Sequence, residues 1–338
     1  MSKVVAYHWA RMVISLGRKV ASADPHIRLM DPRRDGVALA DLLETAFRDE
    51  PADEDGQAVL RMLRSFGVFD LSLTDGATGF LWIEDGRIVG NASLMRNRAR
   101  SDTWVIGNVG THPDFRGRGI ATALVDTCMR YVAGRGAARA ALQVAEGNAA
   151  ALRVYSRLGF AVTGRVTHYA RPSLREMPLA SPMAATSAGQ PRPIGWRDGG
   201  RVWALSRRNF PDGLSYADPV SADDYRPDLK WRLMNAFEGN PVFWLVLGDR
   251  AAIRARVGFD GEQGVLELMP AIDAPVDDRD PLLHAPLARL NPRPTRPVQA
   301  HQSRLADAGS AAAHEALQAH GFTRVRTLAH MLAPVAGR

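Results

Sequence analysis

The chain has little cysteine: its 338 residues contain one, which excludes a framework of intrachain disulfides. No apolar stretch reaches the length of a membrane span. The net charge is +7, yet no run of five basic residues occurs and aromatic residues do not alternate with the basic ones. This pattern favours a solvated basic surface over a nucleic-acid site. The nine histidines show no paired metal-ligand spacing. We therefore expect a cytoplasmic protein with no metal, no membrane partner and no nucleic-acid partner.

The length and the 46% hydrophobic content predict two packed domains. A stretch rich in Pro, Ser and Ala without periodicity indicates a linker at residues 171–193. The first residues are basic, with no acid before Asp24. They predict a helical extension packed on the body, and an amphipathic targeting segment is the alternative. The expected division is an extension at 1–24, a domain at 25–170, the linker at 171–193 and a second domain at 194–338.

One stretch combines a strand, a glycine loop and a helix. Trp104–Val109 is apolar and β-branched, which predicts a buried strand that Pro113 ends. The loop Arg116–Gly119 follows, and helical spacing then begins at Ile120. Two glycines let an anion approach the main chain, and the first N–H groups of a helix lack intrahelical partners. The stretch therefore predicts a site for a phosphate or pyrophosphate.

A second motif follows at a fixed separation. Ala137–Ala145 can form a strand, and Asn148–Phe160 reads as a short helix closed by Gly159. A dinucleotide-binding fingerprint would need a third glycine where Thr122 stands, and a phosphate-binding loop of the Gly-Lys-Ser/Thr kind is absent. Two alternatives are thereby removed.

Together, Arg116-x-x-Gly119-x-Ala121 after Pro113 and the Asn148, Tyr155 and Gly159-Phe160 series resemble the GCN5-related N-acetyltransferases (GNAT), over about Ile27–Tyr169. The resemblance implies an α/β (α+β) fold with a mixed, centrally splayed sheet flanked by helices, and acetyl-CoA as cosubstrate. The stretch Ala311–Phe322 repeats three alanines, the glycine and the phenylalanine of 149–160. We therefore expect two tandem GNAT-like domains, the second a degenerate copy.

Roles follow from the resemblance. A backbone N–H near Val109 would bind the thioester carbonyl, and Tyr155 would protonate the departing CoA thiolate. The residues implied to bind acetyl-CoA are Val109, Thr111, Arg116, Gly117, Arg118, Gly119, Ile120, Ala121 and Asn148. The implied activity is N-acetyl transfer to a primary amine by direct attack. The alternative is a non-catalytic acyl-CoA-binding regulatory module.

Several roles stay open. The strand Thr103–Asn108 carries no acid or base, so the general base is undetermined, with a water relay or His112 as options. Cys128 lies on an apolar helical stripe and is interpreted as a core residue. The acceptor is a small-molecule or protein amine, and the chain is a monomer or a homodimer. Leu317 aligns with Tyr155 and aspartates follow Pro270, so we expect the second copy not to bind CoA.

Elsewhere the pattern predicts elements in order. Asp35 is expected to cap a helix through Phe47, and Glu84-Asp85-Gly86 to turn a hairpin. Beyond these, strands are expected at 26–31, 78–83, 87–95, 161–169, 242–247, 252–259 and 265–269, and helices at 58–66, 202–210 and 225–237.

Overall fold

The computed structural model describes residues 24–48, 60, 63–64, 78–97, 99–173, 177, 190–209, 212–216, 222, 242–248, 251–257, 263–270, 279–290, 300–306 and 311–335. The expected N-terminal extension, the helix at 225–237 and most of the helix at 58–66 lie outside these residues. The chain divides into two units that interleave along the sequence. The first comprises residues up to Thr163, Tyr216–Pro219 and the end from His330, and the second holds the rest. The division expected from the sequence, into successive segments, stays a prediction.

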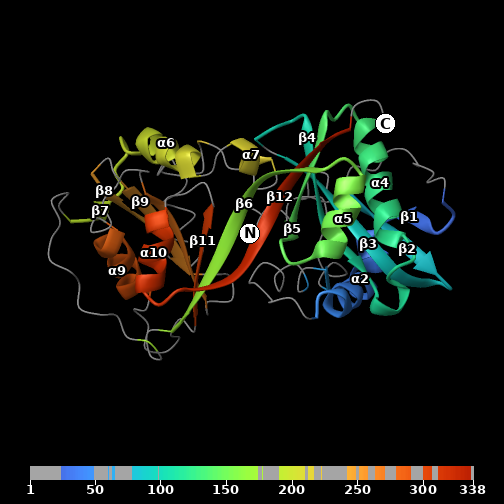
Figure 1. Ribbon diagram of the computed structural model, residues 1–338, viewed down its shortest axis with the longest axis horizontal. Helices are drawn as coiled ribbons and strands as arrows, with labels where there is room; N and C mark the ends of the chain where they lie inside the picture. Colours follow the sequence, from blue (N-terminus) through green and yellow to red (C-terminus); the bar gives the residue numbers. More distant parts are fainter. Residues whose placement is uncertain are drawn as a thin grey trace. The chain divides into compact units, whose positions relative to one another are not determined.

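The first unit is a mixed sheet with helices on both faces (Figure 1). Strands β1 to β4 pair antiparallel in order, and β4 pairs parallel with β5. The last residues of β12 follow β5, and the Val335 N–H donates to the Ala138 carbonyl at 3.0 Å. The strands of this unit are β1 (Ile27–Leu29), β2 (Thr78–Glu84), β3 (Arg87–Arg96), β4 (Thr103–Thr111), β5 (Arg139–Ala145) and the end of β12 (Thr323–Pro334).

Two helices of the first unit cover opposite faces of this sheet. A Cβ built on Gly90 would meet Ile120 and Leu124 of α4 (Ile120–Ala133). A Cβ built on Gly110, in the next cross-strand pair, would meet the α2 residue Ala46 and Phe47, which follows it. Because side chains alternate between faces along a strand, α4 and α2 (Pro32–Ala46) lie on different faces. The expected hairpin is confirmed, with Asp85 and Gly86 both at positive φ.

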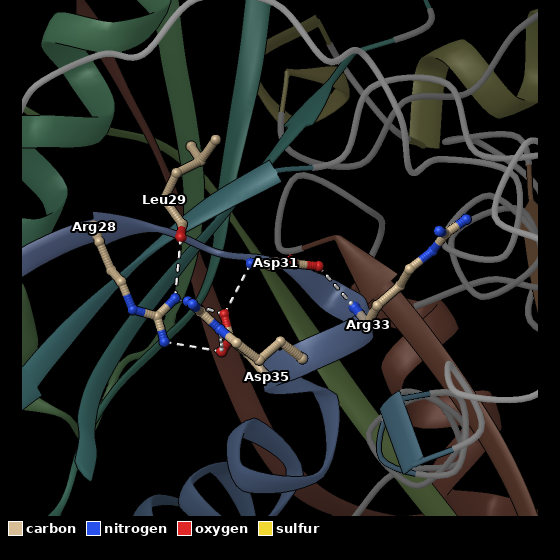
Figure 2. Close-up of polar contacts among 6 residues, drawn as sticks. Arg28, Leu29, Asp31, Arg33 and Asp35 are labelled. Carbon is tan, nitrogen blue, oxygen red and sulfur yellow. Dashed lines mark hydrogen bonds and ion pairs between the residues drawn. The ribbon is translucent and has the colours of Figure 1, made fainter. Parts of the chain in front are cut away.

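The start of α2 corrects one expectation. Asp31, not Asp35, is the N-cap residue, and it accepts from the Arg33 N–H while Pro32 occupies the first turn. Asp35 is instead buried inside the first turn, where Arg28 binds both its carboxylate oxygens at 2.6 and 2.8 Å (Figure 2). The Asp31 N–H donates to the same carboxylate at 2.8 Å. Burial pushes the pKa of Asp35 up, but these hydrogen bonds outweigh it and the pKa is lowered.

The second unit repeats this order. β6 (Ala161–Pro172) pairs antiparallel with β11, β11 pairs parallel with β10, and β10 continues antiparallel through β9 to β8 and β7. Successive residues Ala252 and Ile253 pack under different helices, α6 and α9. The remaining elements are β7 (Arg192–Pro193), α6 (Gly199–Asn209), α7 (Asp212–Ser215), β8 (Val242–Leu247), β9 (Ala251–Val257), β10 (Gln263–Pro270), α9 (Arg279–Leu290), β11 (Ala300–Ala306) and α10 (Ala311–Ala319).

Each unit contains one arginine–aspartate ion pair, which we call a clip. The pairs are Arg28 with Asp35 and Arg192 with Asp198. Arg192 binds both oxygens of Asp198 at 2.7 and 2.9 Å, and the Gly195 N–H adds a third bond at 2.7 Å. Arg28 lies on β1 and Arg192 on β7, and each aspartate lies at or near the start of the helix that follows that strand. The Arg192 hydrogen bonds lower the pKa of Asp198 to about 2. This correspondence supports the internal duplication expected from the sequence.

The sequence did not predict helix α9 or strand β11. Helix α9 contains Pro286 in its interior, which the sequence pattern alone marks as a breaker. Here Leu282, Leu283 and Leu287 are fully buried against the second sheet, so packing outweighs the proline. Part of the expected linker also belongs to an element, because β6 continues to Pro172.

Candidate functional site

The first unit has a gap between two parallel strands. β4 and β5 pair from Thr103 and Arg139 up to Ile106 and Leu142, and the pairing ends there. Both strands nevertheless continue, β4 to Thr111 and β5 to Ala145. Residues 107–109 change from buried to half-buried at the same point. The central splay expected from the sequence is therefore present, and beyond Ile106 it leaves β4 unpaired on its β5 side.

A β-bulge lies on β4 beside this gap. Gly107 pairs with Ser93 and Gly110 with Asn91, so β4 has one residue more than β3 between these two pairs. Asn108 takes the left-handed conformation, with φ +51°. Asparagine tolerates that conformation better than most residues that carry a side chain. The bulge was not predicted, although an asparagine inside a β-branched run was a signal for it.

The glycine loop presents free backbone donors at the start of α4. Gly117 and Gly119 have φ values of +78° and +80°, and a Cβ on either would meet nothing within 4 Å. Gly119 is the N-cap of α4 and has no side chain to cap the helix. The first helical bond is from the Ala123 N–H to the Gly119 carbonyl at 3.0 Å. The N–H groups of Ile120 and Ala121 therefore have no acceptor within the helix, and they lie at the positive end of the helix dipole.

The two arginines of this loop contact the protein itself. Arg116 donates from Nη2 to the Ala46 carbonyl at 2.9 Å and from Nε to the Thr111 carbonyl at 3.4 Å. It thereby ties the loop to the ends of α2 and β4. The Arg118 guanidinium lies over the Phe115 ring at 4.8 Å. Both side chains are exposed, so they add positive charge around the open N–H groups.

The second motif forms α5 (Ala149–Arg157). Asn148 is its N-cap and accepts from the Ala151 N–H at 3.0 Å. The cap uses the side-chain oxygen, which leaves the amide NH₂ as the group that could contact a ligand. Tyr155 is 6% exposed, and its ring lies edge-on to Phe160. The Phe160 N–H closes the helix on the Tyr155 carbonyl at 3.0 Å, with Gly159 at φ +89°.

These elements meet at one edge of the sheet. The glycine loop follows the carboxyl end of β4, and Asn148 follows the carboxyl end of β5. Because the strands are parallel, both ends lie at the same edge, the usual place for a ligand in α/β sheets. Helices α4 and α5 contact each other and lie side by side in Figure 1. All the predicted site residues therefore belong to this edge or to the helices that start there.

The contacts of His112 and Cys128 indicate structural roles for both residues. His112 caps the short helix Pro113–Phe115 by accepting from the Asp114 N–H at 3.4 Å, and its ring is edge-on to Phe115. Cys128 is fully buried on α4, and burial raises the pKa of its thiol well above the usual range. A thiol in that state is a poor nucleophile.

Within the described part of the chain no group of three metal-ligating side chains occurs, and no helix there is long and apolar enough to cross a membrane.

The second unit has the same gap but different contents. The parallel pairing of β10 with β11 ends at Leu266 and Ser303, as that of β4 with β5 ends at Ile106 and Leu142. Its β9–β10 ladder, however, runs in unbroken register from Gly264 to Pro270. An ion pair crosses this ladder, with Arg254 Nη2 2.6 Å from Glu267 Oε1.

The helix after this gap also matches its counterpart. In α10 the Phe322 N–H donates to the Leu317 carbonyl at 3.0 Å, and Gly321 has φ +79°. Leu317 therefore stands where Tyr155 stands in α5, as the sequence alignment predicted. The aspartates expected after Pro270 lie outside the described residues, apart from Asp280 in α9.

Comparisons with known proteins find one matching family, over part of the chain. Residues 37–160 match the model of the acetyltransferase (GNAT) family. An acetyltransferase of Pectobacterium atrosepticum is 34% identical over 83 residues, which are 25% of this chain and 57% of that protein. An uncharacterized N-acetyltransferase of Methanocaldococcus jannaschii is 35% identical over 75 residues, 22% of this chain and 33% of that protein. The chain thus spans about half of the first relative and a third of the second.

Solved structures extend the likeness to the whole fold. A GCN5-related N-acetyltransferase from Sphaerobacter thermophilus has a TM-score of 0.63 at 15% identity and covers 93% of this chain and 97% of its own. A tandem GNAT protein from the clavulanic acid biosynthesis pathway has a TM-score of 0.61 at 14% identity, with 92% and 99% covered. The tandem GNAT fold expected from the sequence is confirmed.

Proposed function

We propose that this chain, whose residues 37–160 match the GNAT acetyltransferase family, transfers the acetyl group of acetyl-CoA to a primary amine. The observation that carries the proposal is the edge of the first unit where the splayed strands, the open N–H groups of α4 and the start of α5 come together. A pyrophosphate suits the helix start, and an extended thioester arm suits a gap between strands.

Different residues of this edge would contact different parts of acetyl-CoA. The backbone of Gly117, Gly119, Ile120 and Ala121 would hold the pyrophosphate, with Arg116 and Arg118 adding charge. In the gap, the Val109 N–H would bind the thioester oxygen, since β5 no longer pairs there. The other two residues assigned to the cosubstrate are Thr111, at the end of β4, and Asn148, through its amide NH₂.

Transfer would proceed by direct attack. The neutral amine adds to the thioester carbon, and negative charge builds on the oxygen held by the Val109 N–H. The C–S bond then breaks, the N–C bond remains, and Tyr155 donates its proton to the thiolate. A phenol with a pKa near 10 is a plausible donor to a thiolate. The proton lost by the amine leaves to solvent or to a base; a water relay remains a candidate, and His112 already caps a short helix.

The alternative is a non-catalytic module that binds acyl-CoA. It needs the glycine loop but has no use for a proton donor at the sulfur. Tyr155 on α5, at the position that the family motif assigns to the acid, favours the enzyme. The acceptor class, a small molecule or a protein amine, is not determined by these residues.

The test is release of CoA thiol from acetyl-CoA, followed with a panel of small primary amines and amino-terminal peptides. We expect acetylated product with at least one class, in equal amount to the thiol released. Tight acetyl-CoA binding without product across the panel and without hydrolysis would favour the binding module. Absence of binding would contradict both.

A further inference from the structure

We infer that Asn91 is a positioning residue that holds the β4 bulge and thereby aims the Val109 N–H into the gap. The inference rests on the proposed function and names a residue outside the family motif. Asn91 lies on β3, is fully buried, and donates from Nδ2 to the Asn108 carbonyl at 2.7 Å. The same Nδ2 lies 3.2 Å from Ser93 Oγ.

Peptide geometry gives the direction of the Val109 N–H. The Asn108 carbonyl and the Val109 N–H belong to one planar trans peptide, so they point in opposite directions. The carbonyl points at Asn91, on the β3 side of β4. The N–H therefore points to the other side, where the neighbouring strand β5 has already ceased to pair at Leu142. One hydrogen bond thus sets the orientation of a donor in the gap.

The bulge needs this support because its conformation is strained. Asn108 has φ +51°, a region that is unfavourable for a residue with a Cβ. Without a partner for its carbonyl, the segment could relax to the regular ladder that β9 and β10 show in the second unit. There the cross-strand pair that matches Ser93 and Gly107 is Arg254 and Glu267, which form an ion pair within the regular ladder.

Packing alone does not explain an asparagine at position 91. Its Oδ1 accepts no hydrogen bond from the described residues although it is buried. A buried acceptor left unpaired is destabilising, and an apolar residue of similar size would avoid that cost. An amide at this position is explained by its donor, which the Asn108 carbonyl requires.

The experiment compares four variants with the wild type in thiol release. Asn91→Leu keeps the volume and removes the donor, and Asn108→Val makes the positive φ unfavourable. We expect each to lower kcat by about 10–100-fold, part of the loss of a full oxyanion donor. The KM for acetyl-CoA should change less than about threefold, because the glycine loop is untouched. Ser93→Ala, which keeps the bond to Asn108, is the matched control and should retain wild-type kcat.

A rescue separates positioning from packing. In the Asn91→Leu background, Asn108→Gly removes the strain of positive φ and should recover at least about tenfold in kcat. A packing defect would not recover, since glycine weakens a strand further. Wild-type kcat in Asn91→Leu, or a loss that Asn108→Gly leaves unchanged, would overturn the inference while the acetyltransferase stands. A wild type that neither binds acetyl-CoA nor turns over would overturn the proposed function, and the inference with it.

Discussion

The two units of this chain are alike in the elements that form their sheets, and they differ in the residues that are expected to carry out chemistry. Both have the arginine–aspartate clip, both have parallel strands that part after four pairs, and both end the following short helix with Gly-Phe. Only the first has the bulge on the strand beside the gap, and only the first has a tyrosine on that helix. Duplication thus kept the elements that fold the sheet and changed those that could handle a thioester.

The comparison separates two kinds of residue that look alike in a sequence. Asp35 and Asp198 are buried carboxylates. Each is bound by an arginine and by a backbone N–H, so a contribution to stability is enough to explain its burial. Strand β9, the described counterpart of β3 in the second unit, contains no asparagine. Presence in one unit alone therefore marks candidates for function, and the predictions below follow this division.

The largest expected difference is between Tyr155 and Leu317. Tyr155→Phe should lower kcat by about 10²–10⁴-fold with nearly unchanged acetyl-CoA affinity, because it removes a general acid. Leu317→Met, at the matching position of α10, conserves volume and should leave kcat unchanged. Steady-state kinetics of both variants over a range of pH measures this. Undiminished turnover in Tyr155→Phe at every pH would make the tyrosine structural.

The next effect concerns acetyl-CoA binding at one unit. Gly119→Val should weaken affinity by at least about tenfold, since a β-branched residue is an outlier at φ +80° and its side chain would cover the open N–H groups. Gly136→Val is the matched control, because Gly136 has φ +77° and equal open space but lies at the far end of α4.

Calorimetry should then give one acetyl-CoA per wild-type chain and no residual tight site in Gly119→Val. This is the outcome expected if the second unit, with its ion pair and its Leu317, does not bind CoA. Two sites per chain, or equal losses in the two glycine variants, would contradict the prediction.

A smaller and symmetric effect is expected at the clips. Asp35→Asn and Asp198→Asn should each lower the free energy of unfolding by about 1–3 kcal/mol, because each removes a charged partner from an arginine that is partly exposed. Acetyl-CoA affinity should fall in neither beyond the change in folded population. Denaturant unfolding with a binding titration checks both. A specific loss of binding in Asp35→Asn would mean that its clip serves the site directly.

The smallest effect is a dependence of one clip on pH. The pKa of Asp198 is about 2 in the folded chain and near 3.9 in the unfolded chain. Its contribution to the free energy of unfolding is therefore fully present above about pH 4. It should fade as the pH drops from about 4 toward 2, where the folded carboxyl also takes up a proton. The stability difference between wild type and Asp198→Asn should therefore narrow over this range. A difference that stays constant down to pH 2 would show that the pKa is not lowered.

The sequence predicted the first site's local parts well because local parts carry local signals. Glycines at Gly117 and Gly119, a proline before them and helical spacing after them each constrain a few neighbouring residues. The same holds for Asn148 and Gly159, whose capping geometry is confirmed. Their catalytic and binding roles stay predictions, since they depend on a ligand.

The sequence predicted other parts poorly where distant residues decide. Asp35 was expected to cap a helix, but Arg28, seven residues earlier on β1, binds its carboxylate, so even a near neighbour on another element changed its role. Helix α9 was not predicted, and buried leucines pack it against a sheet despite Pro286. The strand from 323 onward was not expected, and its residues are shared between the two units.

The sequence alone determined the order of strand, glycine loop and helix, the internal repeat and the family, because periodicity, capping and turn residues act over a few positions. Tertiary structure alone decided where the parallel strands part, that β4 gains one residue over β3, and that Asn91 meets Asn108 across it. The reason is physical: strand propensity is local, but register, bulges and the partners of buried polar groups depend on which strands become neighbours.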